Sequence, residues 1–444
     1  MLEDDFDNFD ELDPENQSEE WTEVSASDET AFLAALGMQA DKPETLEAEL
    51  SELERLADTA GITVLGKYYQ RRNKQEKGTY FGKGWLQDIS QKMKQAGASL
   101  LIVNDELAPM QTRNIEELFE IKVVDRTEVI LNIFHNHAKT REAKLQVKLA
   151  ELEYQLPRLR RMWEHFDKER GSVRSTGGTA TRGMGEKQIE IDRRLIKREI
   201  GKINRILNQI MQQKTTQRKQ REKTKKICLI GYTNAGKSTL FNALTKAGVL
   251  VEDKLFATLD STTRQIKLDL GGTVVLSDTV GFISNLPHQL IASFKATLME
   301  VQDADLLLHV VDSSDERFET YIDEVNKVLE EIDAQDIKQI LILNKIDLLS
   351  ASSISILRKR FPDAVLISAA KQENFDQLLD MIDATLFKAE KFSLLLPYSE
   401  ARLVSRLHQT AQVLNEEYSE TGIKLDVILS SEEKYLYEKF ILPA

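Results

Sequence analysis

The sequence predicts an α/β protein of several domains, in which a phosphate-loop domain fills most of the second half of the chain. A small parallel α/β domain and an antiparallel helical hairpin precede this domain, and a small α+β appendage follows it. Three observations predict this arrangement: the stretch "GYTNAGKS" after an apolar strand, two runs of leucine and isoleucine at heptad spacing, and alternating strand-like and helix-like segments on either side of those runs.

Length and composition bound the class of protein. The 444 residues are enough for about three domains, and a hydrophobic fraction of 41% supplies buried cores. No apolar run approaches the roughly 18 residues of a membrane helix, and no basic segment followed by an apolar run opens the chain. Cys228 is the only cysteine, so no disulfide joins two parts of the chain. We therefore expect a cytoplasmic protein without a membrane span.

The N-terminus carries the whole net charge of −14. Residues 1–41 contain 14 acidic residues and no lysine or arginine, whereas the rest of the chain has as many acidic as basic residues. This composition is typical of a solvated, disordered segment. We therefore expect residues 1–41 to be an acidic disordered tail that keeps the protein in solution.

Residues 42–139 have the pattern of a small parallel α/β domain. "ITVLGKYY", "SLLIVNDE" and "FEIKVVDR" are short apolar segments typical of strands, and residues 85–96 and 108–118 between them have helical periodicity. "FGKG" at 81–84 is a glycine turn before a helix, and it is too weak a motif to predict a second nucleotide site.

Residues 140–213 predict the antiparallel helical hairpin. Two apolar stripes recur at alternating steps of four and three residues, which is the spacing of helices that pair along one face. These stripes are Leu145, Leu149, Leu152, Leu156, Leu159 and Trp163, and then Ile196, Ile200, Ile203, Leu207 and Ile210. Pro157 should break the first helix locally. The segment "GSVRSTGGTATRGMGE" (171–186) would form the tip loop, and a basic linker (214–226) follows the hairpin.

The phosphate loop opens the domain predicted over residues 227–388. "GYTNAGKS" lies between the strand "KKICLI" and the helix-like "STLFNALTKAG", which is the context that the motif requires. Backbone N–H groups there cradle phosphate oxygens, Lys237 reaches the β- and γ-phosphates, and Ser238 binds Mg²⁺. In "LSDTVG", Asp278 ends an apolar strand, and we expect it to hold Mg²⁺ through water and the Gly281 N–H to contact the γ-phosphate.

A base-recognition motif makes the expected ligand a guanine nucleotide. In "LILNKIDLL", the Asp347 carboxylate accepts hydrogen bonds from the guanine N1–H and N2–H₂ donors, which adenine lacks. "VLISAAK" closes over the base, and Asn374 stands near the position of a usual glycine. The segment is therefore predicted to be a P-loop GTPase domain that binds GTP and GDP. The expected nucleotide contacts are Gly231, Tyr232, Thr233, Asn234, Ala235, Gly236, Lys237, Ser238, Phe256, Ala257, Thr258, Leu259, Asp260, Asp278, Thr279, Val280, Gly281, Asn344, Lys345, Ile346, Asp347, Ser368, Ala369 and Ala370.

The residues alone leave three parts of the chemistry open. The switch threonine that completes the Mg²⁺ shell is Thr258, Thr262 or Thr263, and spacing does not choose between them. Phe282 stands where many switch GTPases have a water-orienting glutamine, so the catalytic group is unknown and we expect slow hydrolysis without outside help. Asn234 is either a K⁺ ligand or a loop asparagine that bonds its own backbone.

Residues 389–444 predict the small appendage. A strand over "KFSLLLP", a helix over about 399–417 and a strand over "IKLDVIL" follow one another, and no long internal repeat accompanies them.

Two functions of different classes fit the hairpin. It binds RNA through its tip and basic residues, or it binds a protein partner along its heptads. The basic residues clustered around the tip and over 193–226, and a tip loop without apolar anchors, favour RNA. Glycines let the backbone approach RNA closely, and arginines pair with phosphate or stack on bases. The expected RNA contacts are Arg174, Gly177, Gly178, Arg182 and Gly183.

Several separate segments resemble the HflX family of GTPases. They are "FGKG", "VVDRTEVILNIF" (123–134), "TREAKLQVKLAELEYQLPRL" (140–159), "TRGMGEKQIEIDRRLI" (181–196), "GYTNAGKSTLFNAL" and "FATLDSTTR". The resemblance implies a cytoplasmic, monomeric GTPase that binds the large ribosomal subunit, its RNA and whole ribosomes, and that splits stalled or idle ribosomes under stress. It also implies that Thr258 is the Mg²⁺ ligand and that the hairpin tip lies near the peptidyl-transferase centre. Ser261 replaces the proline that is usual in the family.

Overall fold

The computed structural model describes residues 29–159, 180–219, 224–245, 255–256, 262–268, 272–283, 300–387, 390–419, 421–429 and 431–442. The chain divides into two compact units. One unit contains Met1–Asn136 and Gln155–Arg193, and the other contains His137–Tyr154 and Arg194–Ala444. The helical hairpin is therefore shared between the two units.

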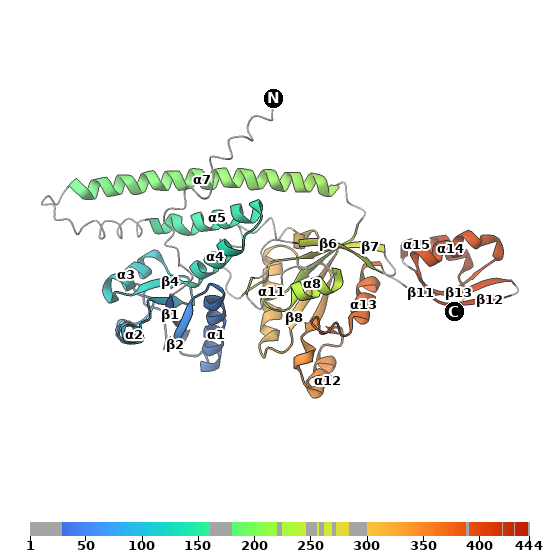
Figure 1. The fold of residues 1–444 in the computed structure, drawn as a ribbon, viewed down its shortest axis with the longest axis horizontal. Coiled ribbons are helices and arrows are strands. Elements are labelled where there is room, and N and C mark those ends of the chain that lie inside the picture. The colour runs from blue at the N-terminus through green and yellow to red at the C-terminus, as the bar shows by residue number, and fades with distance from the viewer. Residues whose placement is uncertain are drawn as a thin grey trace, which may run out of the picture. The chain divides into compact units, whose positions relative to one another are not determined.

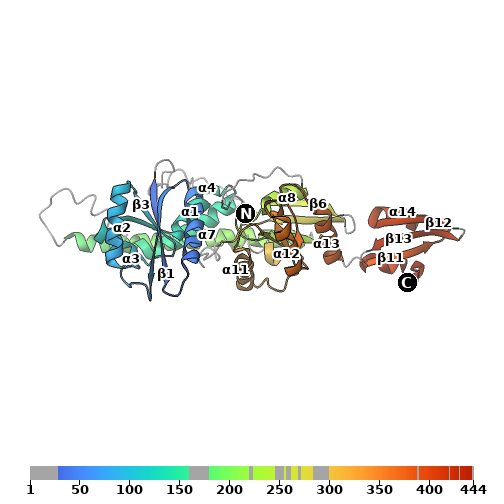
Figure 2. The same ribbon diagram turned by 90° about the horizontal axis from the view of Figure 1, so that it is seen from below.

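The first unit is built on a four-stranded parallel sheet with the strand order β2-β1-β3-β4. Its elements are β1 (Thr30–Met38), α1 (Pro43–Thr59), β2 (Thr63–Arg72), α2 (Lys83–Ala96), β3 (Leu100–Val103), α3 (Pro109–Phe119), β4 (Lys122–Asp125) and α4 (Arg126–His137). Figure 2 shows α2 and α3 on one side of the sheet and α1 on the other. Phe32 and Leu101 of the strands pack against Ile89 and Ile115 of the helices. The predicted small parallel α/β domain is confirmed.

The predicted boundary of the acidic tail is wrong, because β1 lies inside residues 1–41. Thr30–Met38 pairs with both β2 and β3, and Ala31–Ala35 are at most 2% exposed. "TAFLAALGM" has no charged residue, which suits a parallel strand buried on both faces. The acidic residues around this short apolar run dominated the charge count and hid it. The expectation of a disordered tail over residues 1–28 lies outside the described residues.

Two helices pack through the heptad stripes, and Figure 1 shows them side by side. These are α5 (Arg141–Gln155) and α7 (Ala180–Lys219). Leu149 and Leu152 of α5 pack against Ile203 of α7 and its neighbours along the stripe. Among the described helices none is apolar enough over a bilayer's width to cross a membrane, including the 40-residue α7.

The ends of the hairpin helices differ in part from the sequence prediction. α5 stops before Pro157, as expected, and a 3-10 turn, η2 (Leu156–Arg158), follows it. The predicted tip loop (171–186) is too long, because α7 already begins at Ala180. At its other end α7 continues to Lys219, inside the predicted basic linker. Arginine, lysine and glutamine are good helix formers, so a charged segment extends a helix as readily as it forms a linker.

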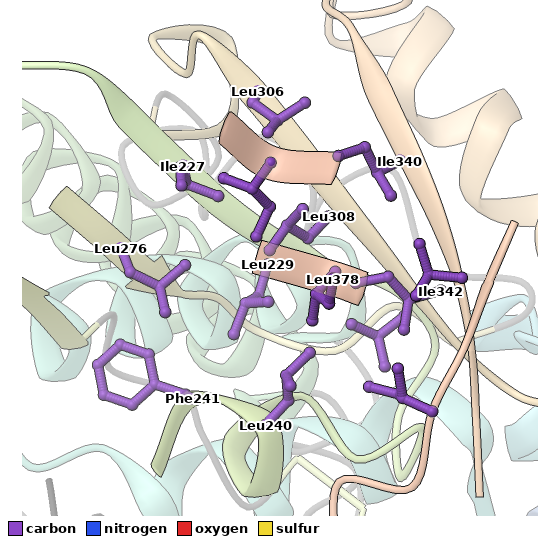
Figure 3. Close-up of a cluster of buried hydrophobic side chains, with 14 of the residues drawn as sticks. Ile227, Leu229, Leu240, Phe241, Leu276, Leu306, Leu308, Ile340, Ile342 and Leu378 are labelled. Atoms are coloured by element: carbon purple, nitrogen blue, oxygen red, sulfur yellow. The ribbon is translucent and has the colours of Figure 1, made fainter. Parts of the chain in front are cut away.

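The second unit contains a six-stranded sheet with the order β10-β9-β8-β5-β7-β6, in which β6 runs antiparallel to β7 and the other pairs are parallel. Its elements are β5 (Lys226–Ile230), α8 (Lys237–Thr245), β6 (Thr262–Leu268), β7 (Gly272–Asp278), β8 (Leu306–Asp312), α11 (Phe318–Glu331), β9 (Gln339–Asn344), η3 (Ile346–Leu348), α12 (Ala351–Arg360), β10 (Val365–Leu366) and α13 (Phe375–Phe387). Figure 3 shows Leu229, Leu308 and Ile342 of the central strands gathered in one buried cluster with Leu240 and Phe241 of α8. Neighbouring parallel strands thus end beside one another, which is where α/β proteins bind ligands.

The last segment forms a three-stranded antiparallel sheet with the order β11-β13-β12. Its elements are β11 (Glu390–Leu396), η4 (Tyr398–Glu400), α14 (Ala401–Thr410), β12 (Gln412–Ser419), β13 (Gly422–Leu429), α15 (Ser431–Tyr437) and η5 (Glu438–Phe440). The α+β appendage is confirmed, but the helix predicted over 399–417 is wrong beyond Thr410. Pairing of β12 with β13 overrides the local helical pattern there.

Candidate nucleotide-binding site

The predicted phosphate loop joins β5 to α8, which begins at Lys237. Gly231 has a φ of 144°, and a Cβ there would lie 2.1 Å from the Val310 carbonyl oxygen. Gly236 has a φ of 93°, and a Cβ there would lie 2.3 Å from Asn344 Nδ2. Both positions therefore require glycine, because a side chain would push the loop away from β8 and β9.

The Lys237 ammonium group lies inside the loop. Its Nζ donates hydrogen bonds to the backbone carbonyl oxygens of Gly231 (3.1 Å) and Tyr232 (2.8 Å), and the residue is 6% exposed. Burial lowers the pKa of Lys237 to about 8, and the negative charge of Asp278 offsets part of this effect. The fold thus holds a cation at the place where the loop binds phosphate.

Ser238 and Asp278 form the pair expected at a magnesium site. Ser238 Oγ donates a hydrogen bond to Asp278 Oδ2 at 2.8 Å, and Asp278 is fully buried at the end of β7. A hydroxyl group beside a buried carboxylate is a set of hard oxygen ligands that fits Mg²⁺. Next in the chain, Thr279 Oγ1 donates to the Leu229 carbonyl oxygen at 2.6 Å, and Val280 is half-buried.

The segment after β7 forms backbone hydrogen bonds with the phosphate loop. The Phe282 N–H donates to the Gly231 carbonyl oxygen at 3.1 Å, and the Thr233 N–H donates to the Phe282 carbonyl oxygen at 2.7 Å. A Cβ on Gly281 would lie 2.9 Å from Lys237 Nζ, so glycine is needed for this close approach. The Phe282 ring is 4% exposed and packs in a hydrophobic core cluster. Its side chain therefore packs and offers no polar group to a water molecule.

Asn344 connects the base-recognition motif with the phosphate loop. Its Nδ2 donates to the Ala235 carbonyl oxygen and its Oδ1 accepts from the Ala369 N–H, both at 2.9 Å. Asp347 Oδ1 accepts a hydrogen bond from the fully buried Ser368 Oγ at 2.8 Å. The structure thus brings the predicted "NKID" and "SAA" segments together, with the Asp347 carboxylate half-exposed between them.

Two left-handed backbone positions shape the base site. Lys345 has a φ of 63°, and its Nζ pairs with Asp312 Oδ2 at 2.7 Å. Asn374 has a φ of 62°, and its Nδ2 donates to the Leu366 carbonyl oxygen at 2.7 Å. Asparagine adopts the left-handed region more readily than other side chains, which explains how it replaces the usual glycine. Ile346, between the motif residues, is buried, and Ala370 is exposed.

The structure does not describe every predicted site residue. Outside the described residues lie Ala257, Thr258, Leu259, Asp260, Arg174, Gly177 and Gly178. Phe256 is buried with a φ of 55°. Of the alternative switch threonines, Thr262 lies opposite Asp278 in the β6–β7 ladder. Arg182 and Gly183 lie within α7 and therefore not in a loop.

Sequence reasoning missed the residues behind the motifs. Ser313, after β8, donates through its Oγ to the Asn344 carbonyl oxygen at 2.6 Å. The Tyr321 ring of α11 stacks on the Tyr232 ring of the phosphate loop. Neither residue belongs to a nucleotide motif. The one available signal was position, because β8 lies beside β5 and its carboxyl end must come near the loop.

Known proteins resemble the chain over most of its length. Family models described as GTP-binding GTPase N-terminal, GTP-binding GTPase Middle Region and 50S ribosome-binding GTPase match residues 47–135, 137–221 and 226–345. GTPase HflX of Magnetococcus marinus is 42% identical over 392 residues, covering 88% of this chain and 89% of that protein. GTPase HflX of Escherichia coli is 42% identical over 379 residues, covering 84% and 88%. The crystal structure of a GTP-binding protein from Sulfolobus solfataricus in complex with GDP is 26% identical, covers 81% of this chain and 99% of that chain, and has a TM-score of 0.40.

Three features define a P-loop GTPase: a loop that requires glycine and surrounds a buried lysine, a serine–aspartate pair beside it, and a guanine-recognition motif at the end of β9. The likeness to the two GTPases extends beyond this domain, through the α/β domain and the hairpin. The chain belongs to the HflX family of GTPases. It is therefore an enzyme that converts GTP and water to GDP and phosphate.

Proposed function

We propose that the chain, as a monomer in the cytoplasm, binds the large ribosomal subunit and whole ribosomes and splits stalled or idle ribosomes under stress. The observation that carries the proposal is the exposed basic side of α7, whose apolar stripe is covered by α5. Over residues 189–213 of this helix, the exposed basic side chains are Arg193, Arg194, Lys197, Arg198, Lys202 and Arg205. Basic side chains on a long helix neutralise RNA phosphates. The family model described as 50S ribosome-binding GTPase supports the same partner.

The chemistry of the site assigns a part to each group. Lys237 binds phosphate oxygens, and Asp347 pairs with guanine. Mg²⁺, when bound, neutralises charge on the β- and γ-phosphates; Ser238 would hold it directly and Asp278 through water, with Thr258 as the expected third ligand. Because Phe282 packs away from solvent, its side chain does not position the attacking water. We infer that hydrolysis is slow until the ribosome completes the site.

Co-sedimentation with purified ribosomes and separated subunits tests the partner. We expect the chain to pellet with the large subunit and whole ribosomes with a non-hydrolysable GTP analogue, and less with GDP or without nucleotide. Added salt should weaken pelleting steeply, because counterions compete for RNA phosphates. Pelleting that is equal in all three nucleotide states would reject a GTP-dependent ribosome factor. A sucrose-gradient profile then measures splitting.

The tip segment has its own test. We propose that Arg174 and Arg182 contact ribosomal RNA. Replacing both with alanine should leave GTP affinity and ribosome-free turnover unchanged and lower ribosome binding and ribosome-stimulated hydrolysis. Arg358→Ala with Lys359→Ala is the matched control, because it removes two charges from the exposed side of α12. If both double variants bind ribosomes like the parent, the tip is only a connector.

We also propose a K⁺ ion beside Asn234. The residue is half-buried in the phosphate loop with a φ of 61°. A cation there would neutralise charge between the phosphates in place of an arginine. Replacing NaCl with KCl at equal ionic strength should raise turnover. Asn234→Gly should remove this salt effect, because glycine keeps the left-handed backbone and loses only the amide. Equal turnover in both salts, with and without ribosomes, rejects the idea.

A further inference from the structure

Two tyrosines stack behind the phosphate loop. The ring centroids of Tyr232 in the loop and Tyr321 in α11 lie 4.0 Å apart, with an angle of 18° between the ring planes. Tyr232 is 6% exposed and Tyr321 is 5% exposed. Buried, offset aromatic pairs stabilise a contact beyond the area that they bury. Tyr232 occupies a variable position of the loop motif, so the motif itself does not require this contact.

The backbone around Tyr232 is where the phosphate-binding parts meet. The Tyr232 carbonyl oxygen accepts the Lys237 ammonium at 2.8 Å. The residues on either side of it, Gly231 and Thr233, bond to the backbone of Phe282 at 3.1 and 2.7 Å. A shift of Tyr232 would therefore move both the phosphate-binding lysine and the start of the segment after β7.

Tyr321 is itself fixed by the start of α11. Its hydroxyl oxygen accepts from Arg317 Nη2 at 2.6 Å, and its O–H donates to Asp315 Oδ2 at 3.4 Å. The Arg317 guanidinium carbon lies 5.2 Å from the Tyr321 ring centroid, and the Arg317 N–H donates to Asp315 Oδ1 at 2.9 Å. The ring thus has a defined position that does not depend on a bound nucleotide.

The loop between β8 and α11, residues 312–317, also contacts the base-recognition motif. At its beginning, Asp312 pairs with Lys345 at 2.7 Å. The Ser313 N–H and Oγ both donate to the Asn344 carbonyl oxygen, at 3.0 and 2.6 Å. Residues 312–317 therefore lie between the guanine-recognition motif and the tyrosine that supports the phosphate loop.

The geometry points to Tyr321 as a positioning residue of the GTPase reaction. It holds Tyr232, and through the backbone of Tyr232 it holds Lys237 and Phe282 where phosphate binding needs them. The loop is preorganised by α11 before the nucleotide arrives, and preorganised groups bind more tightly because less order is lost on binding. This role is independent of the ribosome and goes beyond the proposed function.

The test compares three variants on α11. Tyr321→Leu removes the ring and keeps an apolar side chain. Tyr321→Phe keeps the stack and loses only the hydroxyl bonds. Phe318→Leu is the matched control, because Phe318 lies in the same helix as Tyr321 and its ring packs on Phe361, the residue after α12, at a centroid distance of 5.8 Å. For each variant, dissociation of a fluorescent GDP analogue and steady-state kcat and KM for GTP are measured without ribosomes.

We expect GDP dissociation to be roughly two- to tenfold faster in Tyr321→Leu, with a raised KM, as the energy of one aromatic pair allows. Tyr321→Phe should stay within about twofold of the parent, and so should Phe318→Leu. An unchanged GDP dissociation rate in folded Tyr321→Leu overturns the proposal. A GDP dissociation rate that is raised as much in Tyr321→Phe as in Tyr321→Leu also overturns it, because the stacked ring would then not be the cause. If Tyr321→Leu does not fold, Tyr232→Leu removes the stack from the other side and must raise the GDP dissociation rate to the same extent.

Discussion

At the scale of single residues, we expect nucleotide specificity to rest on Asp347. Ser368 Oγ donates a hydrogen bond to its carboxylate at 2.8 Å. Lys345, two residues before it, has a left-handed backbone conformation. Asp347→Asn keeps one oxygen acceptor and turns the other into an NH₂ donor, so one of the two guanine donors loses its partner and faces another donor. We expect the affinity for GDP to fall by roughly ten- to a hundredfold, as for a lost hydrogen bond to a charged group. The affinity for xanthine nucleotides should rise. A titration with fluorescent GDP and XDP checks this, and unchanged GDP affinity would contradict the role.

The buried His309 predicts a pH dependence of stability. It lies on β8 between β5 and β9 and is 2% exposed, and its Nε2 makes no hydrogen bond within the described part of the chain. Burial lowers the pKa of His309 to about 4, and the charge of Lys237 acts in the same direction. Between pH 6.5 and 4 the unfolded state therefore binds a proton that the folded state does not, so stability falls as pH falls through this window.

From pH 7 to pH 5 this residue should cost about 2 kcal/mol of unfolding free energy. His309→Leu should remove that part of the loss. Urea denaturation followed by circular dichroism at the two pH values measures it. The parent between pH 7 and 8 is the control, because His309 is mostly neutral in both states there and contributes little to a change in stability. An equal acid-induced loss in the variant and the parent would assign the effect to other groups.

The motif residues of the site were predictable because their spacing reflects one local geometry. A loop between a strand and a helix fixes Gly231, Lys237 and Ser238 relative to one another whatever the rest of the fold does. Tyr321 was not predictable, since its contact with Tyr232 depends on how α11 packs on the sheet. Local sequence carries no record of a contact between residues 89 positions apart.

At the scale of elements, η2 is anchored in the first unit by Arg158. Its side chain is 6% exposed and pairs with Asp125 at 3.4 Å, and its Nη2 also donates to the Leu107 carbonyl oxygen at 2.9 Å. Arg158→Leu leaves the Asp125 carboxylate buried without this cation, which costs about 3 kcal/mol. Urea denaturation followed by tryptophan fluorescence measures the loss, because Trp85 packs on Phe81 in this unit.

The matched control is Arg113→Leu. Arg113 pairs with Glu117 on the surface of α3, with side chains 41% and 34% exposed. Removal of this pair should change stability by less than about 1 kcal/mol. Similar losses in the two arginine variants would mean that the buried pair has no special part in anchoring η2.

Helices and strands were predicted correctly where the spacing of apolar residues identifies the side chains that pack. They were predicted wrongly where only the composition of a segment was used. The heptad stripes of α5 and α7 identify the side chains that meet, and Pro157 marks the end of α5. The sequence analysis missed β1 because this short apolar strand follows a long acidic segment. It assigned part of β12 (Gln412–Ser419) to a helix because the strand partner of β12, β13, lies later in the chain. Strand pairing between distant segments is decided by tertiary contacts, so local propensity alone misassigns such segments.

At the scale of the whole molecule, the charge separation has a definable consequence. Residues 1–28 hold acidic residues and no basic ones, whereas α7 exposes a row of basic side chains. A polyanion in the same chain competes with RNA for basic side chains, and added salt screens the competition. We therefore hypothesise that the acidic segment weakens ribosome binding, and that deletion of residues 1–28 tightens it most at low salt.

The end point of the deletion decides whether this experiment can be interpreted. Removing residues 1–41 would also remove β1, the strand that pairs with both β2 and β3, and would destroy the core of the first unit. Removing residues 1–28 keeps that strand and the Glu29–Lys122 pair at 3.0 Å. We expect the shorter deletion to keep the circular dichroism spectrum and GTP turnover of the parent and to tighten ribosome binding several-fold at about 50 mM salt, with the difference fading at about 200 mM. Loss of the fold in the longer deletion alone would confirm where the first domain begins. Equal ribosome affinities of the parent and the shorter deletion at both salt concentrations would mean that the acidic segment has no part in RNA binding.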